Sequence, residues 1–157
     1  MSVEVQPIWG MELNRIINAV DKFNKGYACS QAILTEYCEL FDLDEETALK
    51  ISAGFGGGMR NGKTCGAVTG AYMVLGLKLG DQNCVTADGR KKVYDAVVEF
   101  TKSFEQRYGS TDCKELLGCN VATADGIKKA KEENLFYTLC PKYVKSAAEI
   151  LEGMLNK

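Results

Sequence analysis

The sequence predicts an all-α protein, a single-domain bundle of about seven helices. Two observations predict this fold class. Apolar residues recur at intervals of three and four positions along most of the chain, which is the period of an amphipathic helix. No alternation of apolar and polar residues, the pattern of a half-buried strand, extends beyond four residues. The 157 residues suffice for one apolar core. We therefore assign residues 1–157 to one all-helical domain and expect residues 1–10 to form a loosely ordered N-terminal segment.

The first half of the chain contains three predicted helices. The first ends near Gly26 and carries the apolar stripe Leu13, Ile16, Ile17, Val20 and Phe23. The second spans residues 29–41, with the predicted buried face Ile33, Tyr37 and Leu40. Asp44 has the character of an N-cap and begins a short helix that ends near Ala53. The glycine-rich segment 54–59 then interrupts any helix.

The second half of the chain contains the remaining predicted helices. Thr64 is the expected cap of a helix over 65–79. Thr86 or Asp88 begins a long helix that closes near Gly109, with the apolar face Val93, Val97, Phe100 and Phe104. A capping box ahead of residues 116–117 and a helical pattern over 125–133 follow. The last helix begins at Pro141 and carries Val144, Ala148, Leu151 and Leu155.

Composition excludes several classes of function. The net charge is −2, from 19 basic and 21 acidic residues without a basic cluster, so no nucleic-acid partner is expected. The longest nearly apolar run, residues 65–77, is too short to span a bilayer, and no membrane insertion is expected. The N-terminal residues do not have the pattern of a secretory signal. These features favour a cytoplasmic protein.

Cysteine is the residue type most able to form a reactive site in this sequence. Histidine is absent, which excludes imidazole bases and imidazole metal ligands, whereas cysteine occurs seven times. Four cysteines fall at predicted helix N-termini: Cys29, Cys65, Cys113 and Cys140. The amide groups and the dipole at a helix N-terminus stabilise a thiolate, which attacks disulfides and binds metals. We therefore expect the pKa of these four thiols to be lowered.

The remaining cysteines and the glycines have simpler interpretations. Cys38 is predicted to be a core residue, Cys84 an exposed incidental thiol, and Cys119 a structural residue rather than a resolving thiol. Five glycines surround Cys65 in the sequence: Gly56, Gly57, Gly58, Gly66 and Gly70. They serve either close packing of helices or the approach of backbone to a group bound beside Cys65.

No CxxC pair occurs, so a site that uses all four cysteines must be assembled by the fold from four helices. Such a set could hold an iron–sulfur cluster or tetrahedral zinc, or act as two dithiol pairs. A non-catalytic helical interaction module with core cysteines is the third alternative. The sequence identifies no substrate, electron donor or acceptor, and a homodimer stays open.

The residues around these cysteines resemble a known family. Residues 65–70 form a CGAxxG motif, with Cys29 upstream and Cys113 and Cys140 downstream. This arrangement is similar to that of the redox-active C_GCAxxG_C_C family. The resemblance implies redox chemistry at the four cysteines: electron transfer or thiol–disulfide exchange with an unidentified redox partner. An iron–sulfur cluster is the first expected cofactor and zinc the second. Haem of the kind found in related split-Soret cytochromes is not expected, because histidine and the haem attachment motif are absent.

Overall fold

The computed structural model describes residues 8–157, which form an all-α fold, as the sequence predicts. Seven of its α-helices have at least seven residues. No β-strand occurs in this range, and Thr64 and Asp112 form an isolated antiparallel bridge. The α-helices are α1 (Ile8–Asn24), α2 (Cys29–Tyr37), α3 (Glu45–Ser52), α4 (Gly66–Leu79), α5 (Ala87–Tyr108), α6 (Cys113–Leu117), α7 (Ala124–Glu132), α8 (Leu135–Thr138) and α9 (Cys140–Leu155). Four short segments of other helical types are η1 (Cys38–Phe41), η2 (Ala53–Phe55), η3 (Gly58–Gly62) and η4 (Gln82–Val85).

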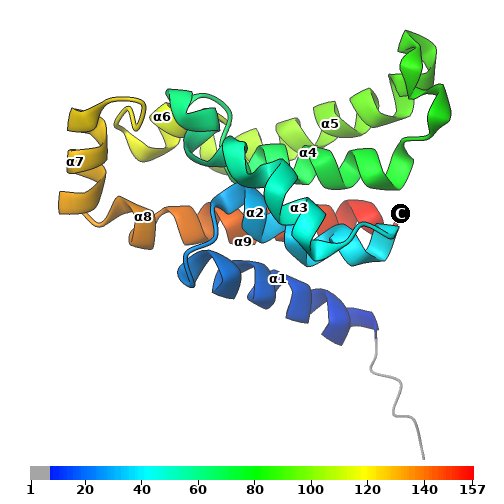
Figure 1. Cartoon of the computed structure of the whole chain (residues 1–157), viewed down its shortest axis with the longest axis horizontal. Helices are drawn as coiled ribbons and strands as arrows, with labels where there is room; N and C mark the ends of the chain where they lie inside the picture. The colour runs from blue at the N-terminus through cyan, green and yellow to red at the C-terminus, as the bar shows by residue number, and fades with distance from the viewer. Residues whose placement is uncertain (1–7) are drawn as a thin grey trace, which may run out of the picture.

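Helix α2 lies at the centre of the bundle. It packs against α1, α3, α4 and α9, while α4 also packs against α5 and α9 (Figure 1). In the view of Figure 1, α4 and α5 form the upper layer, α2 and α9 the middle and α1 the lower layer, with α7 at one end. The segments that carry the four predicted site cysteines begin α2, α6 and α9 and immediately precede α4.

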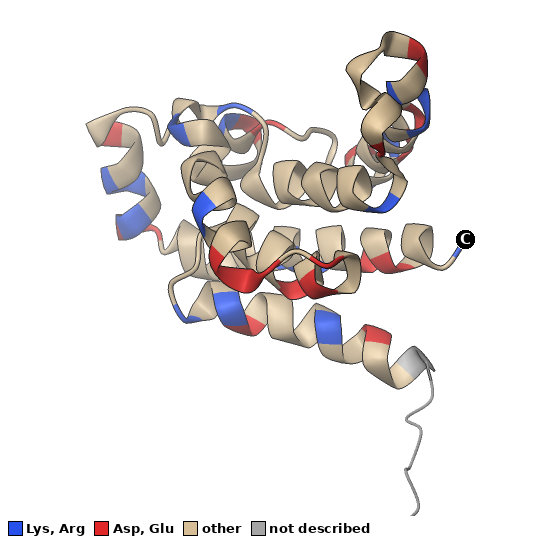
Figure 2. Ribbon diagram, turned by 45° about the vertical axis from the view of Figure 1, so that its right-hand side comes forward, with Lys and Arg blue, Asp and Glu red and all other residues tan. Residues whose placement is uncertain are grey.

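The core is built around α4, which has a single charged residue, Lys78, near its C-terminal end (Figure 2). Such an apolar helix is stable when neighbours cover most of its surface. Phe100 and Phe104 of α5 are completely buried, as predicted, and so are Val144 and Ala148 of α9. Among the helices of residues 8–157, none has both the length and the apolar character that crossing a bilayer requires.

The predicted capping residues define several helix starts. The Asp44 carboxylate accepts a hydrogen bond of 2.9 Å from the Thr47 amide. Of the two candidates for the start of the long helix, Thr86 is the cap, since its hydroxyl accepts a 3.0 Å bond from the amide of Gly89. Each bond satisfies an amide that would otherwise have no partner in the first helical turn.

Some predicted boundaries and faces were wrong. The second helix changes to a tighter 3₁₀ turn at Cys38, which rotates Leu40 out of the core so that it is 51% exposed. In α1, Leu13 and Ile17 are about half exposed, and Ala19 is the completely buried residue. Helix α8 was not predicted. The expected loose N-terminal segment falls mostly on residues 1–7, which lie outside the described residues, and α1 already includes residues 8–10.

The glycine-rich segment forms a left-handed turn. Gly57, Gly58, Met59 and Arg60 have φ angles of 63°, 62°, 58° and 57°. Glycine adopts this conformation freely, whereas a residue with a Cβ atom pays about 1–2 kcal/mol for it. The turn is closed by a 3.1 Å bond from the amide of Lys63 to the carbonyl of Gly58. The surrounding fold therefore holds two residues, Met59 and Arg60, in an unfavourable backbone conformation.

A buried ion pair, not predicted from the sequence, joins the helices far from the cysteines. Glu152 of α9 is 5% exposed and accepts bonds of 2.7 and 2.9 Å from the guanidinium of Arg15 in α1. The hydroxyl of Tyr37 in α2 donates a third bond, of 2.9 Å, to the same carboxylate. These bonds satisfy the buried charge and fix the relative position of the three helices.

Candidate functional site

Each predicted site cysteine lies at the start of a helix. Cys29, Cys113 and Cys140 are the first residues of α2, α6 and α9. Cys65 is the N-cap of α4, a position that we expected Thr64 to occupy. Thr64 instead takes part in the bridge to Asp112, so α4 begins one residue later than predicted.

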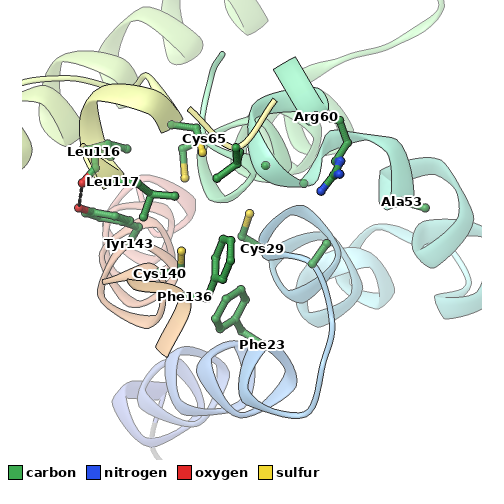
Figure 3. A pocket seen from close by; sticks show the side chains of 15 residues that line it. Phe23, Cys29, Ala53, Arg60, Cys65, Leu116, Leu117, Phe136, Cys140 and Tyr143 are labelled. Atoms are coloured by element: carbon green, nitrogen blue, oxygen red, sulfur yellow. Dashed lines mark hydrogen bonds between the residues drawn. The ribbon is translucent and has the colours of Figure 1, made fainter. Parts of the chain in front are cut away.

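The four cysteines line one cavity of about 260 Å³. Figure 3 shows the labelled sulfur atoms of Cys29, Cys65 and Cys140 around the same space. Its apolar walls are Phe23, Leu116, Leu117, Val121, Phe136 and Tyr143. The fold thus gathers thiols from four helices at a mostly hydrophobic pocket.

Backbone pairing explains why two of the cysteines meet. The amide of Cys65 donates a 2.8 Å bond to the carbonyl of Thr111, and the amide of Cys113 donates a 2.6 Å bond to the carbonyl of Lys63. These two bonds hold the segments before α4 and α6 side by side. The hydroxyl of Tyr143 then donates a 2.7 Å bond to the carbonyl of Leu116, which ties α6 to the helix that carries Cys140.

Two of the glycines serve close packing of helices, one of the two roles that the sequence left open. Gly66 and Gly70 allow α4 to lie against α2: a Cβ on Gly66 would clash with Cys29 Sγ, and one on Gly70 would lie 2.9 Å from the carbonyl oxygen of Ser30. Gly56 and Gly57 line the cavity. A Cβ on Gly58 would clash with the backbone of Lys63, so this glycine closes the left-handed turn.

Cys29 has the environment of a stabilised thiolate. Its sulfur lies against the start of α4, where a Cβ on Gly66 would clash with it. The Cys65 thiol, followed by the backbone amides of Gly57, Ser30 and Gly66, lowers the pKa of Cys29 to about 6 by hydrogen bonding to its thiolate, although burial opposes ionisation. Two of the five predicted glycines therefore contact this sulfur through their amide groups.

The other three thiols do not follow the prediction of a lowered pKa. Burial raises the pKa of Cys113 and of Cys140 to about 12. The pKa of Cys65 is also raised, because this thiol acts as the hydrogen-bond partner of Cys29 and keeps its proton. The expectation neglected desolvation, which outweighs the helix N-terminus when a thiol is buried in an apolar wall.

The three remaining cysteines lie outside the cavity wall. Cys38 is completely buried, as predicted, and its thiol donates to the carbonyl of Thr35. Cys84 is half-buried rather than exposed, because its sulfur accepts from the amide of Asp81. Cys119 is buried at 9% exposure among the residues of the core.

Comparison with known proteins agrees with this cysteine arrangement. The family described as "Putative redox-active protein (C_GCAxxG_C_C)" matches residues 27–154, which include all four cysteines of the cavity. The chain belongs to this family. No curated protein and no solved structure matches the chain.

The donor set that the C_GCAxxG_C_C family pattern brings together has the chemistry of a metal site, since thiolates bind zinc and iron–sulfur clusters. Its geometry does not fit one. Within residues 8–157, no three side chains of cysteine, aspartate or glutamate are close enough together to hold a metal ion. In this arrangement the four thiols line a cavity and do not converge on one point.

The sequence did not indicate the charged residue of the cavity. Arg60 lines the cavity from the left-handed turn. An arginine alone gives no signal of a site in the sequence, but Arg60 directly follows the glycine-rich segment 54–59, which marks the region in which it lies. In this C_GCAxxG_C_C chain the turn conformation, which the sequence does not specify, brings Arg60 to the thiols.

Proposed function

We propose that this chain is a thiol–disulfide redox protein whose reactive pair is Cys29 and Cys65. The observation that carries the proposal is the placement of these two thiols at the wall of one cavity, where Gly66, the residue after Cys65, lies directly against Cys29 Sγ. Two neighbouring thiols can become one disulfide without a rearrangement of distant segments. The cavity gives a second reactant access to the same place.

Cys29 is the attacking residue, since the amides of Gly57 and Gly66 stabilise its thiolate. The thiolate attacks one sulfur of a partner disulfide; a mixed disulfide forms and one partner thiolate leaves. Cys65 loses its proton to solvent and attacks Cys29 Sγ, which releases the second partner thiolate. Two electrons pass to the partner, which becomes two thiols, and the chain gains one disulfide. The reverse sequence reduces the chain.

Cys113 and Cys140 supply two more thiols at the same cavity. Their buried, protonated state makes them slow to attack while Cys29 is a thiolate. We propose that they act after the first pair: the thiolate of one attacks the Cys29–Cys65 disulfide, the thiolate of the other resolves that intermediate, and a Cys113–Cys140 disulfide forms while Cys29 and Cys65 return to thiols. This assignment keeps the four cysteines of the family pattern in one function.

The test is disulfide mapping. The reduced full chain is treated with one equivalent of 2-hydroxyethyl disulfide, alkylated, digested and analysed by mass spectrometry. We expect the Cys29–Cys65 linked peptides, and their loss in Cys29→Ser and Cys65→Ser. The matched control is Cys84→Ser, which changes a half-buried thiol away from the cavity and should leave the linkage intact. Linked peptides that join Cys29 to Cys113 or Cys140 in place of Cys65 would contradict the assigned pair.

Anaerobic purification separates the dithiol function from the metal-bound alternatives. We expect protein without a visible absorption band and without stoichiometric iron or zinc. A brown protein whose absorption is lost in Cys65→Ser would replace this proposal with an iron–sulfur protein. One equivalent of zinc held without redox activity would replace it with a zinc site.

A further inference from the structure

The cavity contains one positively charged side chain. Of the lining residues that the structure describes, Arg60 is the one cation, and the other walls are the four cysteines, glycines and mostly hydrocarbon groups. Figure 3 shows Arg60 extending down from its turn, on the opposite side of the view from Cys140 and Tyr143. The cation and the cysteines therefore face the same space.

We propose that Arg60 binds the carboxylate of a small organic disulfide, which the proposed function of Cys29 and Cys65 then reduces. The inference rests on that function and adds the chemical class of the substrate. Arg60 has no acidic partner among the described residues, and the carboxylate of a ligand would supply one.

The guanidinium is available for a ligand. Within residues 8–157, Arg60 forms no ion pair with an aspartate or glutamate, whereas Arg15 and Arg107 both do. Its side chain folds back over the turn, because a Cβ placed on Gly57 would lie 3.7 Å from Cδ of Arg60. The amide of Gly57 is one of the groups that bind Cys29 Sγ. Arg60 and Cys29 therefore both lie near Gly57, and both line the cavity.

The backbone makes this placement costly, which favours a binding role over an incidental one. Met59 and Arg60 follow Gly57 and Gly58 in the left-handed conformation, which residues with a Cβ atom rarely adopt. Unfavourable backbone of this kind is concentrated at ligand sites, where the surrounding fold imposes it. An extended backbone at Arg60 would direct the side chain elsewhere.

The walls define the rest of the ligand. A planar guanidinium binds a carboxylate through two parallel hydrogen bonds. Phe23 and Phe136 offer hydrocarbon surface for a short methylene chain, and a cavity of about 260 Å³ limits the ligand to a small molecule. A disulfide sulfur of the ligand would then face Cys29. The exchange yields two carboxylate-bearing thiols from one disulfide, with the Cys29–Cys65 disulfide as the other product.

Binding is tested without redox chemistry. Suberate has the chain of 3,3′-dithiodipropionate with two methylene groups in place of the sulfurs. We expect calorimetric titration of the reduced full chain to detect suberate binding, and Arg60→Gln to weaken it about tenfold through loss of charge-assisted hydrogen bonds. Arg60→Lys, which keeps the charge but not the planar fork, should lose less. The matched control is Lys63→Gln, an exposed cation of the same loop outside the cavity, whose binding should equal that of the unmodified chain.

Selectivity is tested by the rates of disulfide exchange. The reduced chain should react faster with 3,3′-dithiodipropionate than with the neutral 2-hydroxyethyl disulfide. The ratio of these two rates should fall about tenfold in Arg60→Gln and should not change in Lys63→Gln.

Two results would overturn the inference: suberate that binds Arg60→Gln as it binds the unmodified chain, or Lys63→Gln that loses binding equally. Failure of the proposed function has a different signature. If neither disulfide links Cys29 to Cys65 while suberate binding still depends on Arg60, the redox function fails and the carboxylate site stands.

Discussion

Replacing Gly66 with alanine tests the contact on which the site depends. A Cβ at this position would clash with Cys29 Sγ and would lie 3.0 Å from the amide nitrogen of Ser30 and 3.1 Å from the carbonyl oxygen of Phe55. Two of these three neighbours are backbone atoms, which cannot rotate away. The added methyl group must therefore displace the thiol and separate the start of α4 from α2.

The matched control lies on the same helix. A Cβ on Gly76 meets no atom within 4 Å, so Gly76→Ala should gain the helix preference of alanine, about 0.5–1 kcal/mol. Overpacking of a tight site costs about 1–3 kcal/mol, which exceeds this gain at Gly66. We expect the free energy of unfolding of the two variants to differ by about 2 kcal/mol, with Gly66→Ala the less stable. For a chain of this size that difference is about 4–8 °C in Tm.

Urea denaturation in the presence of a reductant, monitored by circular dichroism, measures this difference in the free energy of unfolding. A second measurement, the rate of alkylation of Cys29 in the folded protein, should fall in Gly66→Ala because the thiol has left its amide partners. Equal stabilisation in Gly66→Ala and Gly76→Ala would show that α2 and α4 are not in close contact at Cys29, and the geometry argued for the site would be refuted.

Two further predictions concern ionisation and stability. The rate of Cys29 alkylation follows its thiolate fraction, so the rate should be constant above pH 7 and fall to half at about pH 6. Cys113, with a pKa of about 12, should stay nearly unreactive at pH 7. Peptide mass spectrometry over this pH range measures both rates, and a half-point near pH 9 for Cys29 would contradict the environment described for its thiol. Arg15→Ala leaves a buried carboxylate without its cation and should lower the free energy of unfolding by about 3 kcal/mol. Lys91→Ala, which removes one partner of an exposed ion pair, should change it by less than about 1 kcal/mol, and similar losses in the two variants would show that the Arg15 pair is not buried.

Local signals in the sequence were sufficient to predict the fold class and most helix starts. Asp44 and Thr86 act through contacts within a few residues, and such contacts can be recognised without knowledge of the fold. Leu40 was misplaced because a 3₁₀ turn after Tyr37 depends on how the helix meets its neighbours. The Arg15–Glu152 pair joins residues 137 positions apart, and no local pattern indicates it.

The candidate site could be predicted in part for the same reason. Helix starts and the family pattern are features of the sequence, and they are sufficient to single out the four cysteines. The pKa of each thiol, however, depends on burial and on hydrogen bonds from other segments, which is why Cys29 and Cys140 differ so widely. Arg60 reaches the cavity through a left-handed backbone, a conformation that the residue type disfavours.

Cys29 and Cys65, whose thiols line one cavity, are 36 positions apart in the sequence. A covalent link between them would remove conformational freedom from the unfolded chain and raise the stability of the native state by about 3–4 kcal/mol. Thermodynamic linkage requires the converse: folding lowers the reduction potential of the pair by about 60–90 mV relative to the unfolded chain. Formation of this disulfide and folding of the chain would therefore be thermodynamically coupled. A sample oxidised at this pair should have a higher Tm than a reduced one.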